Sequence, residues 1–268
     1  MTRIDPDRVQ SLLSTEALGR SVVFFEETVS TNAAAKELGR NGAPHGALVL
    51  CRRQTAGRGR RGRSWFSGED AVAMTLLICP NFPMEFGPRC IIAIALGVCR
   101  ALRFFGADAR IKWPNDIIAD GRKLCGILLE ADAAGFVAAG IGVNVNQREF
   151  PADIMDTAGS LFFQIGRETD PNEVVARILA EIEPLLDACG DDASYAALLE
   201  TYKTLSATIG SRVRVIAPDG EYCGMAAGLD ALGLLVVKKD SGEIVTVSAG
   251  DVSIRGAFDN GHCQTLNE

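Results

Sequence analysis

The pattern of hydrophobic and polar positions along the first two thirds of the chain predicts strands and helices in an irregular order. Apolar runs of strand length, several of them uninterrupted, are typical of buried strands. These runs cover residues 21–27, 47–52, 71–79, 123–131 and 135–146. They lack the regular strand and helix alternation of a doubly wound sheet. We therefore expect a mixed sheet with helices packed against it.

Apolar residues at helical spacing predict helices between and after these strands. Asp5 before Pro6 and Asp170 before Pro171 are typical helix starts, because the aspartate can cap the helix and proline fits its first position. The expected helices begin near residue 6, cover residues 33–40 and 90–105, follow residue 171 and cover residues 193–202. The third of them is apolar on almost every face, which indicates a buried helix.

Beyond Gly210 the pattern changes to short β runs separated by turns. Five such runs in fewer than fifty residues are typical of a small SH3-like barrel. The polar residues after Phe258 are expected to be loose. The sequence thus predicts an α+β fold in three parts: a mixed-sheet domain with packed helices at residues 1–206, an SH3-like β-barrel at residues 207–258 and a flexible tail at residues 259–268.

The charge balance narrows the choice of partners. Lys and Arg number 27 against 34 Asp and Glu, a net charge of −7, and a net negative protein is a poor general binder of nucleic acid. The N-terminal sequence lacks the apolar stretch of a signal peptide, and no later run is long and charge-free enough to span a bilayer. We therefore expect a cytoplasmic protein that binds neither nucleic acid nor membranes.

The cysteine and histidine content argues against disulfides and metal sites. None of the eight cysteines belongs to a Cys-x-x-Cys pair, so small buried thiols are the favoured interpretation. The chain has two histidines, His45 and His262. A zinc site or a Ser-His-Asp triad therefore lacks parts.

Positive charge is concentrated in the loop QTAGRGRRGRSWFS at residues 54–67, where four arginines and three glycines share residues 57–63. Taken alone, such a cluster is often a solvated charge run or a nucleic-acid patch. The glycines, however, let the backbone approach a ligand, and guanidinium groups bind phosphate and carboxylate oxygens. Trp65 adds a flat face suited to a purine. The loop is therefore a candidate site for a small anion.

A second cluster is KWPND. Pro114 fixes a turn there, which would direct Lys112, Asn115 and Asp116 into one cleft. The alternative is that the lysine is an ordinary surface residue beside a loop aspartate.

Two strand motifs supply further candidates. Lys123 opens KLCGILLE and could lie beside the KWPND turn, although it could also be a surface lysine, and Gly126 indicates close packing over that strand. In GIGVNVN, Gly140 and Gly142 permit close approach and Asn144 lies at the end of a strand, which is a weak signal by itself.

The triplet STN precedes the helix expected at residues 33–40. Ser30, Thr31 and Asn32 could each cap that helix, but a helix needs a single N-cap. Two polar side chains are left, and together with Gln54 they could bind a polar, uncharged group.

In this order, STN, QTAGRGRRGRSWFS, KWPND, KLCGILLE and GIGVNVN resemble the motifs of the biotin protein ligases. The motifs span residues 30–146, and the C-terminal β runs look like that family's small β domain. The resemblance implies a catalytic domain like those of class II aminoacyl-tRNA synthetases and biotin synthetases. It also implies the reaction: biotin and ATP form biotinyl-5′-AMP and pyrophosphate, and the biotinyl group passes to one lysine of a biotin carboxyl carrier protein.

The resemblance assigns roles to the residues that match the motifs. The implied biotin-binding residues are Ser30, Thr31, Asn32, Gln54, Gly57, Arg58, Gly59, Arg60, Lys123 and Gly126. The implied ATP-binding residues are Arg60, Arg63, Trp65, Asn115, Asp116, Lys123 and Asn144. Among these, Lys123, Asp116 and Arg60 would be catalytic, and Asp116 would hold Mg²⁺ through the phosphates. The STN triplet and Gln54 would address the ureido ring, and the arginine loop would cover the adenylate.

Two other functions stay open on the sequence. A lipoate-type protein ligase is the nearer one, since related folds adenylate lipoate, although the residues of the STN and arginine motifs favour biotin. A nucleic-acid-binding module that uses the arginine loop is the alternative from another class. Some biotin ligases also carry an N-terminal DNA-binding domain and repress transcription. With 29 residues before Ser30, we expect neither that domain nor repressor function. The resemblance is compatible with a homodimer.

Overall fold

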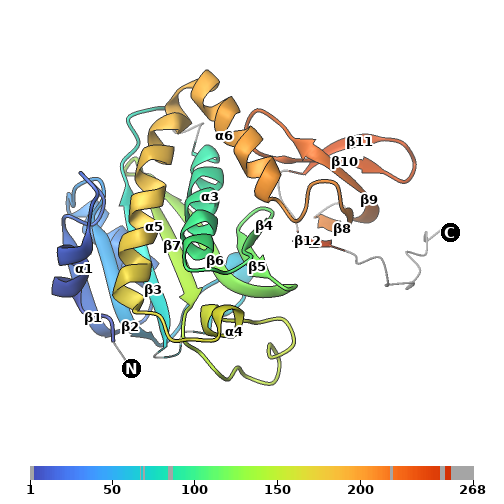
Figure 1. Ribbon diagram of the computed structural model, residues 1–268. Helices are drawn as coiled ribbons and strands as arrows, with labels where there is room; N and C mark the ends of the chain where they lie inside the picture. Colours follow the sequence, from blue (N-terminus) through green and yellow to red (C-terminus); the bar gives the residue numbers. More distant parts are fainter. Residues whose placement is uncertain are drawn as a thin grey trace.

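The computed structural model describes residues 3–66, 68, 70–83, 87–217, 220–247 and 251–254. Figure 1 shows a large β-sheet with helices packed on it and a smaller sheet formed by the last strands of the chain. Parallel and antiparallel neighbours both occur in the large sheet, so the prediction of a mixed α+β fold is confirmed. The expected tail, residues 259–268, lies outside the described residues.

The large sheet has seven strands in the order β1-β2-β3-β7-β6-β5-β4. Its strands are β1 (Val22–Thr28), β2 (Leu48–Gln54), β3 (Ala71–Ile78), β4 (Arg110–Lys112), β5 (Asp116–Ala119), β6 (Arg122–Asp132) and β7 (Phe136–Asn144). β1 and β2 are parallel, and the other neighbouring pairs are antiparallel. All five strands expected from the apolar runs are present, and the short strands β4 and β5 flank the predicted turn at Pro114.

The expected helices are present, and two of them, α1 and α5, start at the aspartate caps predicted for them. The helices are α1 (Pro6–Leu12), α2 (Thr31–Arg40), α3 (Arg89–Phe104), α4 (Leu161–Ile165), α5 (Pro171–Leu186) and α6 (Asp192–Leu205), with 3-10 turns η1 (Arg60–Gly62) and η3 (Asp187–Gly190). Asp5 and Asp170 accept hydrogen bonds from backbone N–H groups of the first turns of α1 and α5. Within the described ranges, no helix is long and apolar enough to cross a membrane.

The two faces of the large sheet bury different groups. Helices α3 and α5 pack against each other over one face, where Leu48 and Leu50 join the main core. Because side chains alternate along a strand, Val49 points to the opposite face and packs against Ala35 of α2. On that second face the middle strands carry small or polar residues: Thr75, Gly126, Gly140 and Gly142. The second face therefore leaves room for a site.

The smaller sheet is antiparallel, with the order β11-β10-β9-β8-β12. Its strands are β8 (Arg212–Ala217), β9 (Gly220–Leu229), β10 (Leu235–Lys239), β11 (Ile244–Val247) and β12 (Asp251–Ile254). The five strands expected after Gly210 are thus confirmed. Their closure into an SH3-like barrel stays a prediction.

Among the described cysteines, five are buried free thiols as expected, Cys79 is a partly buried free thiol, and Cys223 departs from the expectation. Free thiols occur at Cys51, Cys79, Cys90, Cys99, Cys125 and Cys189. Cys223 of β9 is disulfide-bonded, so the prediction of thiols throughout is wrong at this position. A disulfide joins residues that the fold brings together, and the absence of a Cys-x-x-Cys spacing does not exclude it.

Candidate functional site

A cavity of about 240 Å³ lies on the second face of the large sheet and gathers most of the residues predicted for the site. The predicted residues that line it are Ser30, Thr31, Asn32, Gln54, Arg58, Gly59, Arg60, Arg63, Trp65, Lys112, Asn115, Asp116, Lys123, Gly126, Gly140 and Gly142. Gly57 and Asn144 do not line it. The motifs are spread over more than ninety residues of sequence, and the sheet brings them together.

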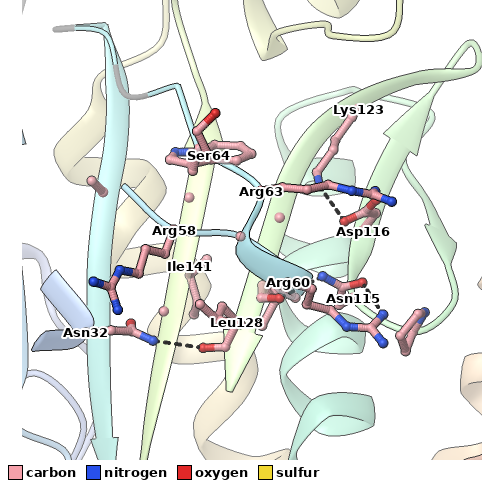
Figure 2. Close-up of a pocket in the computed structure, with 18 of the residues that line it drawn as sticks. Asn32, Arg58, Arg60, Arg63, Ser64, Asn115, Asp116, Lys123, Leu128 and Ile141 are labelled. Carbon is pink, nitrogen blue, oxygen red and sulfur yellow. Dashed lines mark hydrogen bonds and ion pairs between the residues drawn. The ribbon is translucent and has the colours of Figure 1, made fainter. Parts of the chain in front are cut away.

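One end of the cavity has a wall of uncharged polar side chains, toward which Arg58 reaches (Figure 2). Ser30, Thr31 and Asn32 lie at the start of α2, and each is at most 5% exposed. Ser30 occupies the N-cap position, but its side chain makes no capping hydrogen bond. Gln54, at the end of β2, accepts a hydrogen bond at Oε1 from the Thr31 backbone N–H at 2.9 Å, and the same oxygen lies 3.2 Å from Thr31 Oγ1. None of the three side chains of the triplet therefore caps the helix, and all three can make other contacts.

Two residues that the sequence did not single out hold this end together. Thr75 of β3 is fully buried, and its hydroxyl lies 2.8 Å from Thr31 Oγ1 and 2.7 Å from Asn32 Oδ1. Glu130 of β6 accepts a hydrogen bond from Asn32 Nδ2 at 2.8 Å. Thr75 is the polar residue inside the apolar run at residues 71–79, a signal that could have identified it, whereas Glu130 has no comparable signal.

Glu130 is held in its charged form. Burial favours the neutral acid, but the pKa of Glu130 lies below its ordinary value because Lys36 and Asn32 donate hydrogen bonds to the carboxylate. Lys36 Nζ lies 2.8 Å from Glu130 Oε1. The positive charge of Arg58 acts in the same direction. The ionised carboxylate of Glu130 therefore lies behind the uncharged side chains at this end of the cavity.

The arginine loop forms a tight reversal of the chain. The Gly59 N–H donates to the carbonyl oxygen of Arg63 at 2.7 Å, and the Trp65 N–H donates to that of Gly57 at 2.9 Å. A Cβ at Gly57 would lie 2.7 Å from the Trp65 carbonyl oxygen. Gly57 is therefore required by the close approach of two backbone segments and not by a direct contact with the cavity.

The other end of the cavity is charged. Lys123 Nζ lies 2.6 Å from Asp116 Oδ1, and a dashed line marks this ion pair in Figure 2. Asp116 Oδ1 is buried, so the ammonium of Lys123 offsets the charge of a carboxylate oxygen that is shielded from water. Arg60 Nη1 donates to Asn115 Oδ1 at 3.2 Å, and Asn115 Nδ2 donates to the Ile127 carbonyl oxygen at 2.8 Å. The predicted cations, acid and amide thus meet in one place.

Trp65 lies across the middle of the site above two glycines. A Cβ at Gly142 would lie 2.4 Å from the indole, and one at Gly126 would lie 3.1 Å from it. The expectation of close packing over Gly126 is therefore confirmed. The ammonium of Lys123 lies 5.6 Å from the centre of the Trp65 ring. Trp65 and Lys123 also line a second cavity of about 140 Å³, so the indole lies between the main cavity and this second one.

Asn144 lines the second cavity. Its Nδ2 donates to the carbonyl oxygens of Gly159 at 2.8 Å and Lys123 at 3.3 Å, and its Oδ1 accepts from Gln147 at 3.2 Å. These bonds tie the end of β7 to the start of β6. The predicted contact of Asn144 with ATP stays a prediction.

The smaller sheet also reaches the cavity, a position that the sequence left open. Ile216 and Val252 are part of the cavity lining. Trp113, within the KWPND turn, donates its backbone N–H to Thr208 Oγ1 at 2.9 Å and its indole N–H to the Gly233 carbonyl oxygen at 3.0 Å. The turn that carries Asn115 and Asp116 is thus anchored on the C-terminal part of the chain.

The site offers little for a metal ion bound by protein alone. Among the described residues there is no group of three or more His, Cys, Asp or Glu side chains that could hold a metal. Asp116 is the acidic residue of the cavity lining. A hard cation there would need most of its oxygen ligands from outside the protein.

Two family profiles match the chain. The biotin/lipoate A/B protein ligase family matches residues 24–146, and the biotin protein ligase C-terminal domain matches residues 208–255. The first match contains every residue predicted for the site. The second covers the smaller sheet.

Relatives and solved structures with the same architecture span most of the chain. The bifunctional ligase/repressor BirA of Bacillus subtilis is 33% identical over 261 residues, covering 94% of this chain and 79% of that protein. The biotin–[acetyl-CoA-carboxylase] ligase of Mycobacterium tuberculosis is 35% identical, covering 87% and 88%. The structure of biotin protein ligase from Aquifex aeolicus in complex with biotin and ATP has a TM-score of 0.77 at 28% identity, covering 88% of this chain and 99% of that one.

Proposed function

Because the chain belongs to the biotin protein ligase family, we propose that its main cavity joins biotin to ATP and passes the biotinyl group to a lysine of an acceptor protein. The protein is an ATP-dependent ligase that acts on biotin. One observation carries the assignment to this cavity: it has an uncharged polar wall at one end and arginine, lysine and aspartate side chains at the other. Biotin has the same polarity, with a cyclic urea at one end and a carboxylate at the other.

The proposed biotin contacts follow this polarity. Ser30, Thr31, Asn32 and Gln54 would surround the urea. Between the two ends Leu128 lines the cavity (Figure 2), and its apolar side chain suits the ring and chain of biotin. Met74 and Ile141 also border the cavity, but they belong to the main core of the other face. The proposed contacts along the chain and carboxylate are Arg58, Gly59, Arg60, Lys123 and Gly126, with Gly57 supporting the loop from outside the cavity.

In the first step, a biotin carboxylate oxygen would attack the α-phosphorus of ATP. A new P–O bond forms, the bond to the β-phosphate bridging oxygen breaks, and pyrophosphate leaves. Two anions approach each other, so cations must offset their repulsion and stabilise the charge that grows on the phosphoryl oxygens. Arg60, Arg63 and Lys123 line the same cavity and would supply that charge. Trp65 and Asn144 would contact the adenine side, and Asn115 the phosphates.

Asp116 fits the Mg²⁺ that accompanies ATP. A carboxylate oxygen is a ligand that Mg²⁺ prefers. Because Lys123 Nζ lies 2.6 Å from Asp116 Oδ1, the other carboxylate oxygen of Asp116 would face the ion. Since no other acid in the described part of the chain lines the cavity, phosphate oxygens and water would complete the shell. The ion would neutralise phosphate charge, and Lys123 would keep Asp116 in place.

In the second step, the acceptor amine would attack the carbonyl carbon of the adenylate. The C–O bond to AMP breaks, AMP leaves and an amide forms. A lysine amine has an ordinary pKa of about 10.4 and must lose a proton first. Asp116 is the proposed proton acceptor. The glycine-rich arginine loop would cover the adenylate and exclude water.

The domain bounds, the barrel and the acceptor protein are also proposals. We propose a catalytic domain at residues 1–206 with the fold of class II aminoacyl-tRNA synthetases, and an SH3-like barrel at residues 207–258 that supports the site. The acceptor would be a biotin carboxyl carrier protein. A homodimer and a cytoplasmic location stay predictions from the sequence.

The proposal is tested by pyrophosphate release from ATP with biotin, with lipoate or with no acid present. We expect release that depends on biotin. Pyrophosphate release at the same rate with and without biotin would contradict the proposal. Release with lipoate in place of biotin would indicate a lipoate-type ligase. Affinity for RNA or DNA that falls steeply with salt, without ATP turnover, would indicate a nucleic-acid-binding module.

A further inference from the structure

The uncharged end of the cavity contains a chain of hydrogen bonds that runs from Glu130 through Asn32 and Thr75 to Thr31. The three contacts measure 2.8, 2.7 and 2.8 Å in that order. Thr31 and Asn32 line the cavity, and Glu130 lies behind them beside Lys36. Since each group has a fixed number of protons to donate, the direction of every bond in the chain can be derived.

The amide of Asn32 has one favourable orientation. Its Nδ2 faces the Leu128 carbonyl oxygen at 3.2 Å and Glu130 Oε2 at 2.8 Å, and both of these atoms only accept. The reversed amide would place an oxygen against two acceptors. Asn32 Oδ1 therefore faces Thr75. Gly140 permits this position, because a Cβ there would lie 2.2 Å from Asn32 Oδ1.

The orientation of Asn32 determines the protons of the two threonines. Asn32 Oδ1 only accepts, so the Thr75 hydroxyl donates its single proton to it. With its proton given to Asn32, Thr75 Oγ1 must accept in its 2.8 Å contact with Thr31. The Thr31 hydroxyl proton therefore points to Thr75 and not to Gln54 Oε1, which lies farther away at 3.2 Å. Gln54 Oε1 keeps the hydrogen bond from the Thr31 backbone N–H at 2.9 Å. Toward the cavity, Thr31 Oγ1 is left with acceptor capacity alone.

We propose that Glu130 is a positioning residue which, through this chain, makes Thr31 Oγ1 a hydrogen-bond acceptor for an N–H group of the bound cyclic urea. The inference rests on the proposed function, since it assigns a direction to one biotin contact. An acceptor-only oxygen suits a urea N–H, whereas the dithiolane ring of lipoate has no N–H. Glu130 thus contributes to the choice of biotin without touching it. A carboxylate suits this role because, when ionised, it cannot donate.

The substitution Glu130→Gln tests the direction of the chain. Lys36 attracts the oxygen of an amide at this position, which turns the amide NH₂ toward Asn32 and favours the reversed orientation. We expect the KM for biotin in pyrophosphate release to rise about tenfold, with the KM for ATP and kcat within twofold. A merely structural role would lower the thermal midpoint or kcat and leave the KM for biotin unchanged.

Further variants separate orientation from charge. Thr75→Val removes the donor to Asn32 at nearly constant volume and should raise the KM for biotin, whereas Thr75→Ser keeps the hydroxyl and should not. Adding Lys36→Met to Glu130→Gln removes the attraction that turns the amide, so the double variant should recover most of the affinity. The matched control Glu200→Gln, which breaks a Lys–Glu pair on the exposed face of α6, should leave all parameters unchanged.

The outcomes distinguish this inference from the proposed function. If wild-type release does not depend on biotin, the proposed function fails and the inference with it. If it does depend on biotin but Glu130→Gln leaves the KM for biotin within twofold, the inference alone is overturned. A double variant no better than Glu130→Gln also overturns it. If Glu130→Gln does not fold, the comparison of Thr75→Val with Thr75→Ser decides, because equal KM values for the two contradict the chain.

Discussion

At the scale of single residues, glycines on one strand decide where the two bulky groups of the site can lie. Gly140 and Gly142 of β7 face the cavity side of the sheet, beneath Asn32 and Trp65 respectively. A Cβ at either position would come within 2.4 Å of the side chain above it, closer than real contacts allow. The floor of the site is therefore flat because these two positions carry no side chain.

Gly142→Ala should displace Trp65 and weaken ATP use. The indole is a rigid ring, so it cannot avoid the new Cβ by a small rotation of its outer atoms. We therefore expect the KM for ATP to rise at least tenfold. Biotin binding without ATP should change less than threefold. Gly228→Ala is the matched control, because a Cβ there meets no atom of the described residues within 4 Å. Unchanged ATP kinetics in Gly142→Ala would show that Trp65 does not contact the nucleotide.

Lys123→Ala should lose adenylation while the protein stays folded. Removing a cation that stabilises a transition state typically costs about 10²-fold or more in rate. The Lys123 side chain is 35% exposed, and a pair this accessible contributes about 1 kcal/mol or less to stability. The thermal midpoint should therefore change little. Full pyrophosphate release by this variant would remove Lys123 from the mechanism.

The residue types of the site were predictable from the sequence, but several of their partners were not. The sequence indicated close approach at Gly126, Gly140 and Gly142 because a glycine inside a strand often marks a place where another group packs closely. It could not indicate which side chain covers each one. Glu130 was missed because a glutamate at the end of a strand is usually a surface residue, and its contact with Asn32 joins residues 98 positions apart.

At the scale of elements, side chains alternate along each strand, which places the main core on one face of the large sheet and the candidate site on the other. One face of the large sheet is covered by α3 and α5 and carries the main core. The other face carries the cavity, with α2 beside it. The apolar runs predicted the long strands well, because burial on both faces leaves an uninterrupted signal. The strands β4 and β5 were missed because each has at most four residues, too few to show a period.

Glu183 of α5 should stabilise the fold in a pH-dependent way. Its carboxylate accepts backbone N–H groups of Glu16, Ala17 and Leu18, each at 2.8 Å. Burial favours the neutral acid, but these three bonds hold the pKa of Glu183 below its ordinary value. A group with a lowered folded pKa stabilises above its unfolded pKa of about 4.3, and the contribution disappears as the pH falls through the folded pKa.

Urea unfolding of wild type and Glu183→Gln at several pH values checks this expectation. Near neutral pH the free energy of unfolding should be about 1 kcal/mol lower in the variant. The difference should shrink toward zero as the solution is acidified below about pH 4. A difference that is independent of pH would mean that the charge of Glu183 plays no part.

At the scale of the whole molecule, the C-terminal part of the chain anchors the KWPND turn by direct hydrogen bonds. Trp113 is bound to Thr208 and Gly233 across 95 and 120 positions of sequence, and Ile216 lies at the cavity itself. Local patterns cannot reveal contacts at such separations, so the sequence predicted two domains without their connection. The turn at Pro114 was predictable, whereas its anchor was not.

Thr208→Val should therefore impair chemistry more than biotin binding. The substitution leaves the buried Trp113 N–H without an acceptor, which costs about 1 to 3 kcal/mol. We expect a lower thermal midpoint and a several-fold lower kcat for adenylation, with the KM for biotin within twofold. Thr201→Val, on the exposed side of α6, is the control. Wild-type kcat in Thr208→Val would mean that the anchor does not position the turn.

The central claim is that one cavity binds biotin and ATP and joins them before any acceptor is present. The most direct measurement mixes the protein with biotin and ATP labelled at the α-phosphate, without acceptor, and then removes free nucleotide by gel filtration. We predict that label stays with the protein as biotinyl-5′-AMP and leaves as AMP when a biotin carboxyl carrier domain is added, which gains biotin on one lysine. Label that is not retained, or that is retained equally without biotin, would contradict the account.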